Sequence, residues 1–187
     1  MKYYLFKDDL TQNEWDDLKN NSLHSTIFNN YSFYKFLNVN FRLVGLKNEK
    51  TAKIDIAMPI FEVSGQNIKL PYIPYQGILI RNLKNSISKD FNLTDFFLEN
   101  LEKKNIKFDS ILSTNFIDIR PFTFRNYKKT GNLYDINFKY TAILNLKKFP
   151  NFEKWLQSIR KLRLREYKKN NKKYKITDLN NFDEFFE

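Results

Sequence analysis

The stretch between Lys53 and Ile73 constrains the fold more than any other part of the sequence. Lys53–Val63 and Asn67–Ile73 each have the apolar, β-prone composition of a strand, and Ser64-Gly65-Gln66-Asn67 at their junction is typical of a tight turn. Strands joined this closely pair antiparallel, because a parallel pair needs a long crossover connection. With another strand over Phe41–Leu46, the sequence predicts a three-stranded antiparallel meander in the middle of the chain.

Helical patterns flank this meander. Thr11-Gln12-Asn13-Glu14 is a capping box, in which the Thr11 and Glu14 side chains each accept a hydrogen bond from a free backbone N–H, so a helix begins there. The other elements that we expect are helices over Asn30–Leu37, Ile87–Lys104, Asn151–Lys169 and Asp178–Glu187, strands over Lys2–Phe6, Lys107–Ser113, Asp135–Leu146 and Lys173–Ile176, and an irregular stretch over 115–133. The predicted fold class is α+β, with a mixed, mostly antiparallel sheet flanked by helices.

The composition excludes several classes of chemistry. The chain has 187 residues, of which 42% are hydrophobic and 17% aromatic, so it has the material for a folded core. It contains no cysteine and a single histidine, His24, which excludes disulfides, thiolate nucleophiles and cysteine zinc sites and disfavours Ser-His-Asp hydrolysis. We therefore expect no metal site.

No part of the sequence has the character of a membrane anchor or a secretion signal. The longest apolar stretch, Ile54–Val63, is interrupted by Asp55 and Glu62 and is far shorter than the ~20 residues of a membrane span. The first ten residues mix charges with aromatic side chains and contain no apolar signal-peptide core. We expect no transmembrane segment and a cytoplasmic protein.

The formal net charge of +11 is concentrated near the C-terminus. Between Arg160 and Lys175 lie nine basic residues and one acidic residue, Glu166. A helix that is merely soluble usually alternates the signs of its charges, so this segment is either a solvated basic face or a surface for a polyanion such as tRNA. The candidate polyanion-binding residues are Lys161, Arg165, Lys168, Lys169 and Lys172.

The predicted order of elements is that of a GNAT-like (acyl-CoA N-acyltransferase-like) domain. GNAT enzymes hold the pyrophosphate of acetyl-CoA on a Gly-rich turn after the third meander strand, where free backbone N–H groups meet the phosphates. The corresponding segment here, Tyr75–Ser86, contains only one glycine, Gly77. We therefore expect that this chain alone binds no acyl-CoA cofactor.

Three segments resemble the FemABX group of peptidoglycan interpeptide-bridge and GNAT-like aminoacyl- and acyltransferases. They are Leu70-Pro71-Tyr72-Ile73-Pro74-Tyr75-Gln76-Gly77, Asp118–Tyr127, and Tyr140–Leu146 followed by Ser158–Tyr167. The resemblance implies two GNAT-like halves in tandem, the first at the acceptor cleft and the second at the donor site. On this reading residues 1–150 are the N-terminal GNAT-like domain, and 151–187 hold a basic amphipathic helix and the start of a truncated second domain.

The resemblance also implies partners. We expect the chain to be a truncated or split form of a longer protein whose missing C-terminal GNAT-like half would use aminoacyl-tRNA or acyl-CoA as the donor. Its terminal apolar face, formed by Leu179, Phe182, Phe185 and Phe186, has no following element to cover it.

The helix expected over Asn151–Lys169 carries the first candidate binding residues. On a helical wheel, Arg163 and Glu166 fall within the apolar stripe of Phe152, Trp155, Leu156, Ile159 and Leu162. The pair is either an internal salt bridge or the end of a cleft in which Arg163, with Arg160 and Glu166, meets an anionic substrate group. Arginine rather than lysine at this place favours bidentate recognition of a phosphate or carboxylate.

The loop Asp118–Tyr127 carries the second set of candidates. It is aromatic and charged, and Pro121 restricts its backbone. Either Asp118 and Arg120 tether the loop to itself, or they contact the acceptor, with Tyr72, Tyr75 and Tyr127 as the opposing wall.

No residue is assigned as catalytic. His24 has the character of an ordinary polar residue in a connection between helices. Asp55 and Glu62 lie on a meander strand where a GNAT general base can occur, but the sequence leaves open which face of the sheet each one occupies.

The leading hypothesis is the acceptor-side half of a FemABX-like acyltransferase, which transfers an aminoacyl or acyl group to an amine of a cell-wall precursor or nucleotide-linked sugar. A non-enzymatic RNA- or polyanion-binding module and a degenerate GNAT scaffold are the alternatives.

Overall fold

The chain forms two compact units, Met1–Asn137 and Phe138–Glu187. A computed structural model describes residues 3–70, 73–82, 87–126, 134–138 and 146–173. The boundary between the two units lies after Asn137, whereas the boundary predicted from the sequence lies after residue 150. The prediction that the second unit opens another GNAT-like domain stays a prediction.

The first unit is built on an antiparallel sheet. Its strands are β1 (Tyr4–Lys7), β2 (Asn40–Asn48), β3 (Lys53–Val63), β4 (Gln66–Ile68) and β5 (Leu79–Ile80). Their order is β1-β2-β3-β4, and β5 pairs with the middle of β3 on the same edge as β4. The predicted meander is confirmed, and the bounds of β3 are those that the sequence predicts.

A two-residue turn joins β3 to β4. Val63 pairs with Gln66, and the two residues between them have positive φ angles, 52° at Ser64 and 76° at Gly65. Positive φ at both central positions is characteristic of the type I′ turn, whose twist matches that of paired strands. The described part of β4 ends at Ile68, so this strand is shorter than the predicted Asn67–Ile73.

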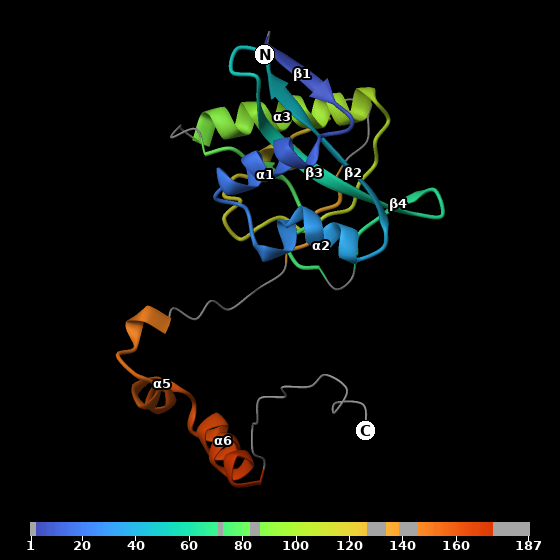
Figure 1. Ribbon diagram of the computed structural model, residues 1–187. Coiled ribbons are helices and arrows are strands. Elements are labelled where there is room, and N and C mark those ends of the chain that lie inside the picture. The colour runs from blue at the N-terminus through green and yellow to red at the C-terminus, as the bar shows by residue number, and fades with distance from the viewer. Residues whose placement is uncertain (1–2, 71–72, 83–86, 127–133, 139–145, 174–187) are drawn as a thin grey trace. The chain divides into compact units, whose positions relative to one another are not determined.

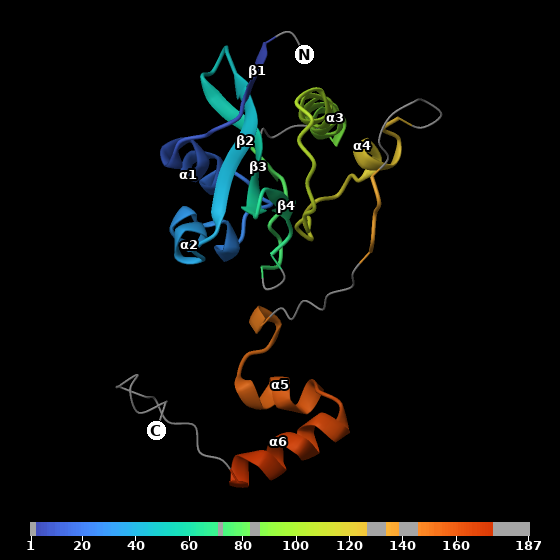
Figure 2. The ribbon, with the colours of Figure 1, turned by 90° about the vertical axis from the view of Figure 1, so that its right-hand side faces the viewer.

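Helices cover both faces of the sheet. Helices α1 (Gln12–Asn20) and α2 (Tyr31–Phe36), with the short 3-10 helix η1 (Ile27–Asn29), lie on one face, and α3 (Ile87–Lys103) lies on the other (Figures 1 and 2). The capping box of α1 is confirmed, because Thr11 accepts from the backbone of Glu14 while the Glu14 carboxylate accepts from the backbone of Thr11. The protein is thus α+β, with a mostly antiparallel sheet between helices.

Two apolar clusters fill the space between these layers. Alternate residues of β3 serve opposite faces, since Ile56, Met58 and Ile60 pack toward α3 while Ala57 and Phe61 pack toward α1 and α2. The helices contribute large buried side chains, each stabilising the fold by about 1.5–3 kcal/mol: Phe97 and Leu101 from α3, and Trp15, Leu18 and Tyr34 from α1 and α2.

Two predicted strands are wrong where the structure describes them. Lys107–Ser113 forms no ladder: Asn67 Nδ2 donates to the Lys107 carbonyl and Lys69 pairs with Asp109 at 3.0 Å, so side chains hold this segment beside β4. Residues 135–138 are not a strand either, while 139–145 lie outside the described residues. Within the stretch predicted to be irregular, α4 (Arg120–Thr123) is a single helical turn that follows Ile119.

The second unit contains the 3-10 helix η2 (Leu146–Lys148), α5 (Phe152–Ser158) and α6 (Lys161–Lys173). The single helix predicted over Asn151–Lys169 is therefore wrong. Helix α5 ends before Ile159, whose backbone is extended with ψ of 157°, and the Ser158 hydroxyl in its last turn donates to the Trp155 carbonyl at 2.6 Å. Lys173 belongs to α6, and the elements predicted beyond it lie outside the described residues.

No helix among the described residues is both long enough and apolar enough to cross a lipid bilayer.

Candidate functional site

A β-bulge in β3 decides where the carboxylate of Asp55 points. In the pairing with β2, Leu46 lies opposite Ile56 and Lys47 lies opposite Ile54, so Asp55 is the extra residue. A bulge shifts the alternation of a strand by one position and redirects a side chain. Ile54 accordingly packs with the cluster under α1, while Asp55 turns toward the face that α3 covers, beside Tyr4.

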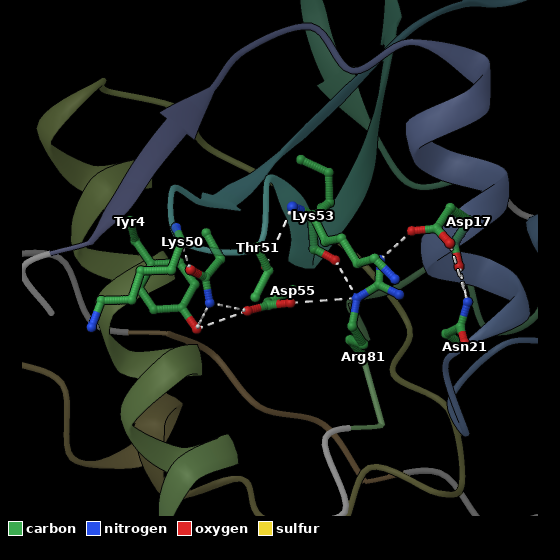
Figure 3. A network of polar contacts seen from close by, with 10 residues as sticks. Tyr4, Asp17, Asn21, Lys50, Thr51, Lys53, Asp55 and Arg81 are labelled. Carbon is green, nitrogen blue, oxygen red and sulfur yellow. Dashed lines mark hydrogen bonds and ion pairs between the residues drawn. The ribbon is translucent and has the colours of Figure 1, made fainter.

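The buried carboxylate of Asp55 is held by side chains from β1 and β2 and by Arg81, the residue that follows β5. The side chain is 2% exposed; Oδ2 accepts from the Tyr4 hydroxyl at 2.9 Å and from Asn48 Nδ2 at 3.0 Å, and Oδ1 lies 3.4 Å from Arg81 Nε. Figure 3 shows Asp55 between Tyr4 and Arg81. Burying a carboxylate is costly unless it is paired and hydrogen-bonded, and this one is both.

Arg81 follows β5 directly and is fixed by several groups. Its backbone N–H donates to the Asp55 carbonyl at 2.8 Å, Nε donates to the Ile54 carbonyl at 2.9 Å, and Nη2 donates to Asp17 of α1 at 2.5 Å. Asp17 in turn accepts from Asn21 at the end of α1. Arg81 therefore links the bulge in β3 to α1. Only 7% of its surface is exposed, and these hydrogen bonds fix the orientation of its side chain.

These residues line a cavity with a volume of about 440 Å³. Three cationic side chains and one carboxylate contribute to its wall, so the cavity is basic in spite of Asp55. The lining residues are Tyr4, Asn48, Thr51, Lys53, Asp55, Arg81 and Lys89.

The ionisation of Tyr4 limits what the site can do. Burial, with the hydrogen bond to Asp55 and the negative charge there, raises the pKa of Tyr4 to about 12, so the phenol stays protonated and donates to the carboxylate. Because Asp55 is already bound by Tyr4, Asn48 and Arg81, it acts as an anchor for the cationic wall and not as a free base. Glu62, the other acidic residue of β3, is exposed near the far end of the strand.

The loop residues predicted to contact an acceptor bind one another. Arg120 donates to Asp118 from its backbone at 3.1 Å, from Nε at 2.8 Å and from Nη2 at 2.6 Å. These hydrogen bonds lower the pKa of the Asp118 carboxyl below its ordinary value. The self-tethering interpretation of this loop is therefore the one the structure supports, although Asp118 also lines a cavity with His24.

Of the predicted aromatic wall, only Tyr75 lies among the described residues; Tyr72 and Tyr127 lie outside them. Tyr75 has a positive φ of 61°, and its carbonyl accepts from Asn29 Nδ2 at 3.2 Å. It lines neither the cavity around Asp55 nor the one around His24.

The predicted apolar setting of Arg163 and Glu166 is wrong. The two side chains are 72% and 47% exposed and pair with each other at 2.8 Å on α6, because the break after α5 removes the continuous stripe. Arg160 lies exposed in that break. The candidate polyanion-binding residues Lys161, Arg165, Lys168, Lys169 and Lys172 are all exposed on α6.

Arg81, Tyr4 and Asn48 are not among the residues predicted from the sequence. One signal was available for Asp55, since it interrupts the most apolar stretch of the chain. Another was available for Arg81, because it is one of only seven arginines in a lysine-rich sequence, the same reasoning that selected Arg163.

Among the residues that the structure describes, no cluster of three or more His, Asp or Glu side chains is arranged to hold a metal ion. Comparison of the chain with protein-family models, with curated proteins and with solved structures gives no match.

Proposed function

We propose that this chain is the acceptor-side half of a FemABX-like acyltransferase, acting in the cytoplasm. It would transfer an aminoacyl or acyl group to an amine of a cell-wall precursor or nucleotide-linked sugar. The elements from β1 to α3, with the antiparallel sheet between α1 and α2 on one face and α3 on the other, follow the first part of the element order expected of a GNAT-like domain, whereas the strand expected after α3 does not form. This agreement supports the proposal together with the resemblance of the three sequence segments.

The basic cavity around Asp55 is the observation that carries the proposal. A nucleotide-linked sugar or a phosphorylated cell-wall precursor presents phosphate oxygens, which suit a wall containing Arg81 and Lys53. Because Asp17 and Asp55 hold Arg81 in place before any ligand arrives, little side-chain freedom is lost on binding. The cavity would therefore bind the anionic part of the acceptor.

The surroundings of Gly77 support the placement of the acyl donor on another domain. Gly77 is buried, and a Cβ atom there would lie 2.8 Å from the Ile111 carbonyl and 3.0 Å from Leu112 Cα. The missing side chain of Gly77 allows close packing against the backbone of Ile111 and Leu112, and it does not expose backbone N–H groups to a pyrophosphate. Calorimetric titration with acetyl-CoA should give no micromolar binding; such binding would instead support a one-domain acetyltransferase.

The acceptor site can be tested on the isolated chain. Titration with uridine diphosphate N-acetylglucosamine and with inorganic phosphate at low ionic strength should show saturable binding. Lys53→Ala should weaken it by about tenfold, the loss typical of one charge-assisted contact. Lys50→Ala is the matched control, because Lys50 lies over the Tyr3 ring at 3.8 Å and does not line the cavity.

Equal effects of the two lysine variants would mean that the anion binds by general charge attraction, and the acceptor site would then be rejected. The absence of any binding would reject it too. The downstream reading frame gives a separate test of the architecture: a second GNAT-like element order there supports the two-half enzyme, and its absence favours a scaffold.

Polyanion binding by α6 is the second candidate function. Seven basic side chains and a single acidic one, Glu166, lie on this helix, and all eight are exposed. If tRNA binds here, log Kd should depend linearly on log salt, with a slope of about 0.7 to 0.9 for each phosphate contact. Replacing Lys168 and Lys172 by alanine should then reduce the slope; a flat salt response would leave α6 as a solvated face.

A further inference from the structure

A second cavity of about 380 Å³ lies in the first unit around the only histidine of the chain. Its wall combines residues of the loop after α1, of β5, of α3 and of the segment before α4. Leu23, Ile80, Phe116 and Ile117 provide apolar surface, and the polar groups include His24, Asp90, Thr94 and Asp118. This lining differs from that of the Asp55 cavity, in which cationic side chains predominate.

The burial of His24 in this cavity favours the neutral form of its ring. Burial lowers the pKa of His24, and interactions with the backbone of Ile80, the carboxylate of Asp90 and the backbone of Asn115 offset this only in part. The ring packs on Phe116 with 5.3 Å between centroids. Its Nδ1 atom is buried and has no hydrogen-bond partner among the described residues. An unpaired buried nitrogen is unfavourable. In the tautomer that carries the proton on Nε2, Nδ1 is an acceptor, and a donor entering the cavity would pair with it.

The two carboxylates of the cavity are not equivalent. Asp118 is neutralised by Arg120, which donates three hydrogen bonds to it. Asp90 forms no ion pair with a lysine or arginine among the described residues; burial raises the pKa of Asp90, and His24 is the only group that opposes this. Among the described residues, Asp90 is thus the carboxylate of this largely apolar wall that no lysine or arginine pairs with.

We propose that the His24 cavity is a binding site for a small amphiphilic ammonium ion, a primary amine with a short apolar body. The ammonium group donates to the carboxylate of Asp90 and to the imidazole of His24, and the apolar body packs against Ile80 and Phe116. This site goes beyond the proposed function, because it uses none of the cationic residues of the Asp55 cavity.

The single histidine makes the test direct, since the protein has one set of imidazole NMR signals. The probe is n-butylammonium, with n-butanol as the uncharged control of nearly the same shape. Saturable shifts of the His24 signals are expected with the amine, and the bound cation should lower the pKa of His24 further because it opposes protonation. Butanol should bind at least about tenfold more weakly.

Variants of the carboxylate complete the test. Asp90→Asn should weaken binding of the amine by about tenfold, while Asp90→Glu should retain it. Asp9→Asn removes an exposed carboxylate outside the cavity and should change nothing. Thermal melting confirms that each variant is folded. Equal binding of butanol and amine, an unchanged affinity in Asp90→Asn, or no saturable shift of the His24 signals would each overturn the inference.

Discussion

Two arginines, one in each unit, show how different the surroundings of the same side chain can be. Arg81 is 7% exposed and is bound by groups from β3 and α1, whereas the side chain of Arg163 is 72% exposed and pairs with Glu166 on its own helix. The first arginine is positioned by contacts distant in sequence. The second is positioned by a neighbour three residues away and remains solvated.

The comparison shows that a high density of charge along a sequence does not indicate where the fold forms a preorganised binding site. The segment from Arg160 to Lys175 holds most of the net charge, yet its described part forms an exposed helix. The basic cavity is instead made by residues spread from Tyr4 to Lys89. Preorganised recognition needs side chains that the fold immobilises, and burial with several partners provides this.

The largest effect is expected from Asp55→Ala. Removal of the carboxylate leaves Arg81 buried beside an empty space and leaves Tyr4 without its acceptor, so the free energy of unfolding should fall by about 3–5 kcal/mol. Urea denaturation measures this. Glu62→Ala, on an exposed position of the same strand, should stay within about 0.5 kcal/mol. If both variants lower the free energy of unfolding by similarly small amounts, Asp55 is solvated. The Asp55–Arg81 pair would then not differ from the exposed Arg163–Glu166 pair on α6.

The next effect separates the two arginines directly. Arg81→Lys keeps the charge but loses the donors that reach the Ile54 carbonyl and Asp17 together, so unfolding should become easier by about 1–3 kcal/mol. Arg163→Lys is the matched control and should change the same quantity by less than about 0.5 kcal/mol. If both substitutions lower the free energy of unfolding equally, Arg163 makes stabilising contacts in spite of its exposure.

Tyr4→Phe should cost about 1 kcal/mol, because one donor to Asp55 is lost while Asn48 and Arg81 remain. The wild-type protein should also depend on alkaline pH. Since the pKa of Tyr4 is raised from its ordinary value to about 12, the folded state holds the phenolic proton more tightly than the unfolded state does.

This stabilisation is complete below about pH 10 and is lost as the pH rises through about 12. Urea denaturation at several pH values should show a smaller alkaline loss in Tyr4→Phe than in the wild-type protein. Parallel curves for the two proteins would mean that Tyr4 is not the group that titrates.

The smallest effect is expected from Glu166→Gln. The exposed pair with Arg163 is an i, i+3 pair on a helix surface, and such pairs contribute less than about 0.5 kcal/mol. Circular dichroism should show almost unchanged helicity, and the remaining effect should vanish in high salt. A large loss of helicity would show that this pair, like Asp55 with Arg81, is a structural contact.

The elements that the sequence predicted well are those set by neighbouring residues. The capping box at Thr11, the β3–β4 turn at Ser64 and Gly65, and the helical span of α3 all depend on preferences and contacts within a few positions. The strand predicted over Lys107–Ser113 is wrong because alternation of residues is only one requirement, and a strand also needs backbone hydrogen bonds to a neighbouring strand, which this segment does not form. Side chains of Asn67 and Lys69 hold that segment instead.

The sequence by itself thus determined the α+β class, the antiparallel meander with the bounds of β3, and the concentration of positive charge on α6. Only the tertiary structure decided that Asp55 faces α3 and that Arg81 meets it. The physical reason is that a bulge is a property of two paired strands: the slip between Ile54 and Ile56 is measured against Leu46 and Lys47, and no pattern within β3 alone fixes it.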